Sequence, residues 1–86
     1  MQTIQEAIHA KIVQLAKDLG HDARSLKDDA VIPDTGLLDS AALMELVVWL
    51  ETTYSLEIDQ DDITLENFGT IRSMIAFLRR QQGRFA

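Results

Sequence analysis

Apolar residues recur at intervals of three and four in three segments of this chain. No segment long enough for a β-strand shows a regular alternation of apolar and polar residues. A spacing of three and four places apolar side chains on one face of a helix, whereas a strand needs a period of two. We therefore predict an all-α fold, a small four-helix bundle of three main helices and one short third helix. The 86 residues are enough for a single domain, residues 1–86. A domain of this length is too short for an enzyme cleft with a buried multi-residue site.

The first helix is predicted over residues 4–19. Thr3 and Glu6 form a capping box at its start, and Gly20 suits the left-handed position just past its end. Its expected core stripe consists of Ile4, Ile8, Ile12, Leu15, Ala16 and Leu19.

Residues 21–38 lose this periodicity, so we expect a long loop between the first and second helices. Pro33 and Gly36 lie in a segment typical of a turn, because proline fixes φ and glycine permits positive φ. A loop this long is usually held by apolar anchors. The candidates are Leu26, Val31, Ile32, Leu37 and Leu38.

The second helix is predicted over residues 40–54, with a core stripe of Leu43, Leu46, Val47, Leu50 and Tyr54. A second set on the same helix mixes apolar, small and acidic side chains, and forms either plain surface or an interface: Ala41, Met44, Glu45, Val48 and Thr52. Trp49 falls between the two sets, where it is either the rim of the core or a recognition residue.

Two further helices are predicted near the C-terminus. Thr64 caps a one-turn helix that ends at Phe68 and is closed by Gly69. Thr70 caps the last helix, and Gly83 is expected to end it. Its core stripe is Ile71, Met74, Ile75 and Leu78, while Arg72, Arg79 and Arg80 face water.

The charge of the chain is unevenly distributed. Its net charge is −6, and nine acidic residues lie between Asp34 and Glu66 without one Lys or Arg. Binding to nucleic acid or to an anionic membrane surface is disfavoured, since both depend on basic side chains. The acidic block is either a solvated face or a surface for a basic protein partner. Without a long apolar run or a signal peptide at the N-terminus, we expect a cytoplasmic protein that does not insert into membranes.

Conventional catalytic and metal sites are poorly supported. The chain has no cysteine, and His9 and His21 lack a metal-ligand spacing, so both are expected to be solvated. The acidic run from Asp59 does not form a calcium loop, because Thr64 and Thr70 occupy the positions that need glycine and glutamate. We therefore expect no metal, no catalytic residue and no enzyme activity.

Asp39 and Ser40 stand immediately before the second helix. Both are good N-cap residues, and capping alone accounts for them. One cap is sufficient, however, and if Asp39 accepts from the amide of Ala41 or Ala42, the Ser40 hydroxyl stays available at an exposed first turn. A phosphodiester there would meet the positive end of the helix dipole, worth about 0.3–1 kcal/mol.

The segment resembles the acyl and peptidyl carrier proteins, whose hallmark is Asp-Ser-Leu at the head of the second of four helices. The resemblance covers nearly the whole chain and rests on several further runs, namely Glu45-Leu46-Val47, Leu50-Glu51, Tyr54, Glu57-Ile58, Leu65-Glu66-Asn67-Phe68 and Thr70-Ile71. The segment from Thr35 to Ser40 is similar to D-alanyl and other stand-alone aminoacyl carriers. One departure is Ala41, where the family usually has leucine, and it bears on the choice of partner.

The resemblance implies that Ser40 carries a 4'-phosphopantetheine arm, taken from coenzyme A, with Asp39 as the adjacent motif residue. It implies a monomeric carrier that holds an acyl or aminoacyl thioester for fatty acid, polyketide, nonribosomal peptide or related specialised metabolism. Its implied partners are a phosphopantetheinyl transferase, an acyl- or aminoacyl-loading ligase and downstream acyl-processing enzymes. We expect basic partners to bind through Ala41, Met44, Glu45, Val48 and Glu51. The alternatives are an unmodified carrier-like helical adaptor and, less in keeping with these residues, a small enzyme.

Overall fold

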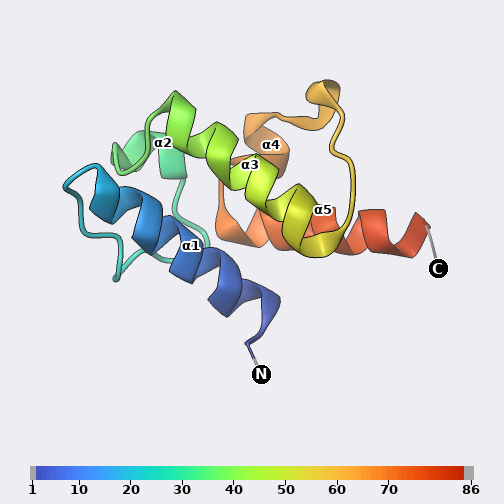
Figure 1. The fold of residues 1–86 in the computed structure, drawn as a ribbon, viewed down its shortest axis with the longest axis horizontal. Helices are drawn as coiled ribbons and strands as arrows, with labels where there is room; N and C mark the ends of the chain where they lie inside the picture. Colours follow the sequence, from blue (N-terminus) through green and yellow to red (C-terminus); the bar gives the residue numbers. More distant parts are fainter. Residues whose placement is uncertain (1, 85–86) are drawn as a thin grey trace.

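The computed structural model describes residues 2–84 of the chain, with side chains as far as Gln81; Met1 and residues 85–86 of the predicted domain lie outside this range. It consists of helices and connecting loops. The elements are α1 (Ile4–Asp18), α2 (Ile32–Thr35), α3 (Ser40–Tyr54), the 3-10 turn η1 (Gln60–Asp62), α4 (Leu65–Phe68) and α5 (Ile71–Arg84). Figure 1 shows the three long helices α1, α3 and α5 around a common interior, with α2 and α4 in the connections. The predicted all-α class and the bounds of the second helix are confirmed.

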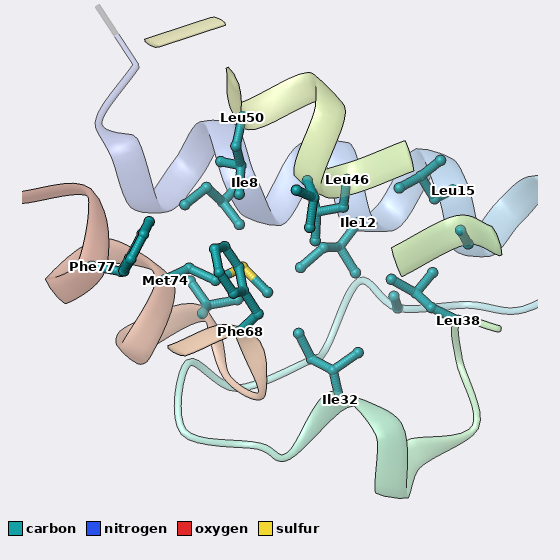
Figure 2. Packing of buried hydrophobic residues seen from close by; sticks show 14 of the residues in the cluster. Ile8, Ile12, Leu15, Ile32, Leu38, Leu46, Leu50, Phe68, Met74 and Phe77 are labelled. Carbon is teal, nitrogen blue, oxygen red and sulfur yellow. The ribbon is translucent and has the colours of Figure 1, made fainter. Parts of the chain in front are cut away.

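The core lies where the apolar stripes of the three long helices meet. α1 packs against both α3 and α5, and α4 packs on α5. Ile12, Leu46 and Met74, one from each long helix, are almost fully buried and point into the same cluster (Figure 2). Phe77 of α5 is also buried, a core position that the predicted stripe of the last helix omitted. No helix within residues 2–84 has the length and apolar character needed to span a membrane.

The ends of α1 follow local sequence signals. The predicted capping box is confirmed: Glu6 N donates to Thr3 Oγ1 and Thr3 N donates to Glu6 Oε1, both at 3.1 Å. Gly20 adopts the expected positive φ of 83°. The prediction that Leu19 belongs to the core stripe is wrong, because the helix ends at Asp18 and the Leu19 side chain is 40% exposed.

The loop after α1 is packed and hydrogen bonded at both ends. Among the predicted anchors Ile32 and Leu38 are buried, while Leu26 and Leu37 pack against the core. Val31 is half-buried. The expectation that His9 is solvated is wrong: it is half-buried on α1, and its Nε2 lies 3.2 Å from the loop carbonyl oxygen of Ala23. The expectation holds for His21, which is exposed.

The short helix α2 was not predicted from the sequence. Pro33 occupies its first turn, where the missing N–H costs nothing, and Gly36 ends it at a φ of 70°. Ile32 anchors this helix, since its side chain is fully buried and its backbone N donates to Gly69 O at 2.7 Å. α2 is therefore held in place by residues more than thirty positions away.

The C-terminal caps match the predictions, with two corrections. Asn67 N donates to Thr64 Oγ1 at 3.2 Å, and Ser73 N donates to Thr70 Oγ1 at 2.9 Å. Gly69 closes α4 as expected, but at a helical φ of −75° rather than in the left-handed region. Gly83 does not end α5, which continues to Arg84; a glycine costs only about 1 kcal/mol inside a helix and does not by itself stop one.

Candidate functional site

The start of α3 separates the capping side chain from an available hydroxyl. Asp39 is the N-cap, with extended backbone, and its Oδ1 accepts from Ala42 N at 2.8 Å. Ser40 is the first residue of the helix, is exposed, and takes no part in this bond. The division of roles predicted from the sequence is therefore present: Asp39 caps and Ser40 stays accessible at the positive end of the helix dipole.

Most of the predicted partner-binding residues form an exposed face along α3. Ala41, Met44, Glu45 and Val48 are all exposed, with Met44 48% and Val48 56% accessible. Trp49 is half-buried against the core, so the core-rim interpretation is the better one. An apolar strip flanked by Glu45 is suited to a partner that presents both apolar and basic groups.

Glu51 differs from the rest of this face. Its side chain is half-buried, and its Oε2 accepts from Ile58 N at 2.9 Å. The carboxylate thus ties the loop after α3 back to the helix. Because a hydrogen bond of this kind holds Glu51 in place, it has a structural role in addition to any contact with a partner.

An apolar pocket of about 240 Å³ opens between α3 and α4, beginning one turn beyond Ser40. Its walls come from α2, α3, α4 and α5 and from the residues between η1 and α4: Pro33, Leu43, Met44, Leu46, Val47, Ile63, Thr64, Leu65, Phe68, Gly69 and Met74. Thr64 has the only side chain with a hydroxyl or amide in this lining, and its Oγ1 already accepts from Asn67 N. The pocket therefore offers contact to apolar groups and no counter-charge to an ion.

Asn67 fixes the wall of this pocket that α4 provides. Its Nδ2 donates to Asp62 O at 2.9 Å, and its Oδ1 accepts from Arg80 Nη2 of α5 at 3.1 Å. The Arg80 guanidinium also lies 5.8 Å from the centre of the Phe77 ring. α4 is only four residues long, so these bonds supply much of the order that its own backbone cannot.

The sequence analysis did not identify two residues of this site as functional. Ile63 was assigned no role, and Leu65 entered only through the predicted one-turn helix and the family resemblance, yet both line the pocket, and Leu65 is 64% exposed. The sequence did contain one indication of this role, because a large apolar residue, Leu65, stands at the first position of a one-turn helix. Within residues 2–84, no three His, Asp or Glu side chains converge as metal ligands.

Comparisons with known proteins agree with this geometry. A search of curated protein sequences gave no significant match. A solved structure, the solution structure of a holo acyl carrier protein from Nitrosomonas europaea, superposes with a TM-score of 0.72 at 23% identity, covering 96% of this chain and 99% of that one. At this identity the likeness concerns the fold. A sequence model of the family described as phosphopantetheine attachment site matches residues 11–78, a span that includes Ser40 and the whole of α3. The chain therefore belongs to the phosphopantetheine attachment-site family, carriers of this covalent cofactor rather than enzymes.

Proposed function

We propose that Ser40 is the attachment point of the 4'-phosphopantetheine arm, and that the chain carries an acyl group as a thioester on it. The observation that carries the proposal is the exposed Ser40 at the head of α3, beside Asp39, which does the capping. In the transfer the Ser40 oxygen bonds to the β-phosphorus of coenzyme A. The pyrophosphate bridge breaks, adenosine 3',5'-bisphosphate leaves, and the hydroxyl proton passes to a base or water in the transferase.

Ser40 supplies the nucleophile in this reaction, whereas its activation falls to the partner. The serine is the first residue of α3 and is exposed, so a transferase can reach it. The phosphodiester that forms is stabilised by the helix dipole by about 0.3–1 kcal/mol. That is small beside the barrier of a phosphoryl transfer, so the chain itself does not catalyse the step.

The test is intact-protein mass after incubation with coenzyme A, Mg²⁺ and a broad-specificity phosphopantetheinyl transferase. We expect the mass to rise by one phosphopantetheine in the wild type and to stay unchanged in Ser40→Ala. Ser55→Ala, another exposed serine at the opposite end of α3, is the matched control and should be modified like the wild type. If the wild type stays unmodified with several transferases, the unmodified adaptor takes the place of this proposal.

The pocket between α3 and α4 favours an apolar acyl cargo over an aminoacyl one. Its lining contains no charged side chain, and enclosing the ammonium of an aminoacyl group without a partner would be costly. An apolar cavity of about 150 Å³ holds a benzene molecule. On that scale a pocket of about 240 Å³ holds a chain of roughly six to ten carbons.

Thermal melting of loaded proteins tests the choice of cargo. The octanoyl form should melt above the holo form, because the chain buries apolar surface in the folded state only. The alanyl form should melt like the holo form. Substitution of Leu46, buried in the pocket wall, by phenylalanine should abolish the octanoyl gain. Equal melting of octanoyl and alanyl forms would refute an acyl preference.

We further propose that the exposed face of α3 recruits basic partners such as the transferase and the loading ligase. The acidic segment without basic residues supports this, since opposite charge speeds encounter without requiring tight binding. Glu45→Lys should slow modification of Ser40 at low salt. Asp18→Lys, an exposed acid on α1, changes the net charge equally and should leave the rate unaltered. Equal rates for the two variants would refute the recognition role.

A further inference from the structure

A second hollow lies on the face of α3 that turns toward α1, and it shares Met44 with the pocket. It is a shallow groove of about 560 Å³ between α1 and α3. Its lining is Lys11, Ala41, Met44, Glu45, Val48 and Trp49. In Figure 1, α1 and α3 run side by side in opposite directions, with the start of α3 beside the C-terminal half of α1.

Along α3 the groove begins at Ala41, the small residue that follows Ser40. Ala41 is exposed and lines the groove. The carriers that the chain resembles usually have leucine at this position, whose larger side chain would occupy the start of the groove. The departure noted in the sequence therefore has a spatial consequence: it leaves the groove open at its first residue, which follows Ser40 in the chain.

The polar groups of the groove match those of a pantetheine arm. Four of its six lining residues are apolar, while Lys11 provides a donor and Glu45 an acceptor. A pantetheine chain has the same mixture: a dimethyl group and methylenes, with amide carbonyls that accept and amide N–H groups that donate. Lys11 is available for this role, since within the described residues its Nζ makes no hydrogen bond other than a long one of 3.3 Å to Gln14 Oε1 at the surface.

The arm is long enough to occupy the groove. Trp49 is nine residues beyond Ser40, which is about 13 Å along a helix at ~1.5 Å per residue. A phosphopantetheine chain is comparable to about five extended residues, roughly 17 Å. An arm lying in the groove would thus pass Ala41, Met44 and Val48 and reach the Trp49 indole.

The geometry points to the groove between α1 and α3 as a resting site for the phosphopantetheine arm of the carrier. This inference rests on the proposed attachment at Ser40. It places the resting arm in the groove toward α1 rather than in the acyl pocket, although Met44 lines both hollows. Met44, Glu45 and Val48 also belong to the proposed partner-binding face, so a docking partner displaces the arm from the groove and makes the thiol available.

The experiment compares the apo and holo forms by nitrogen-15 NMR, after intact mass has established complete modification. Backbone resonances of Lys11 and Val48 and the Trp49 indole N–H should shift between the two forms, and Trp49 fluorescence should move to shorter wavelength as the arm excludes water. Ala41→Leu, compared once intact mass shows that its modification is complete, should lose these shifts, since leucine fills the start of the groove. Leu65→Ala, which alters only the other pocket, should retain them.

The outcomes separate the two proposals. If no mass increase occurs, the attachment at Ser40 fails and this inference fails with it. If modification is complete but the shifts fall on Ile63 and Leu65, the arm lies in the pocket between α3 and α4 and the groove assignment alone is overturned. If modification shifts the resonances of neither the groove nor the pocket, the arm is free in solution and the groove assignment is overturned. The groove would then be a site for an apolar side chain of a partner.

Discussion

Substitutions at Asp39 measure how much the cap of α3 contributes to the carrier fold. The Asp39 carboxylate accepts from Ala42 N at 2.8 Å, a bond that Asp39→Ala removes. Loss of an N-cap of this kind costs about 1 kcal/mol, within a range of about 0.5–2 kcal/mol. In a domain of this size each kcal/mol corresponds to a change in melting temperature of about 4–8 °C. We therefore expect Asp39→Ala to melt about 4–8 °C below the wild type.

Asp39→Asn separates the hydrogen bond from the charge. Asparagine caps helices about as well as aspartate, so this variant should melt within about 2 °C of the wild type, at most half of the smallest shift expected for the alanine variant. Thermal unfolding followed by far-ultraviolet circular dichroism measures both. Unchanged melting of Asp39→Ala would show that the cap contributes nothing, and equal losses in both variants would assign the effect to the charge.

The same pair of variants links the cap to the modification of Ser40. When Asp39 no longer caps, Ser40 is the next residue along the chain with a side chain suited to that role. Engagement of its hydroxyl by a backbone amide would slow transfer of the arm. Modification by the transferase should therefore be slower for Asp39→Ala than for Asp39→Asn. Equal rates would contradict the division of roles between the two residues.

Three further predictions concern other parts of the fold. Gly69→Ala should destabilise the protein by about 1–3 kcal/mol in chemical denaturation, because a Cβ there meets Leu65 O and lies 2.8 Å from Leu65 Cδ1; an unchanged midpoint would contradict this clash. Ser55→Gly should stabilise by about 0.5–1 kcal/mol, since Ser55 closes α3 at a φ of 54°, and a lower melting temperature would count against it. The hydrogen bonds from the Arg24 side chain and backbone lower the pKa of the exposed Asp22 from 3.8 to about 2, so their contribution is present above pH 3.8 and is lost as the pH falls through about 2. Arg24→Gln should raise the Asp22 pKa in an NMR titration, and no change would refute the pairing.

The three long helices and their beginnings were determined by short-range sequence. Apolar spacing of three and four predicted α1, α3 and α5, and caps act between residues only three positions apart, as Thr3 with Glu6 and Asp39 with Ala42 show. Ser40 belongs to this group, because its availability depends only on its neighbour taking the cap. The chemical role proposed for Ser40 rests on the resemblance to a family, since capping accounts equally well for both residues.

The tertiary structure determined the pocket and the groove beside α3. It also determined the positions of the segments that form their walls. α2 depends on Ile32 N donating to Gly69 O, and Glu51 is withdrawn from the exposed face by its bond to Ile58 N. Both bonds join segments that local patterns treat separately. The pocket and the groove likewise need side chains from several elements. Periodicity predicts which face of a helix is apolar, but it does not predict which residue of another helix lies opposite that face. The sequence therefore shows that Ala41 is unusual at its position. The open groove beside Ala41 exists only because α1 and α3 pack together.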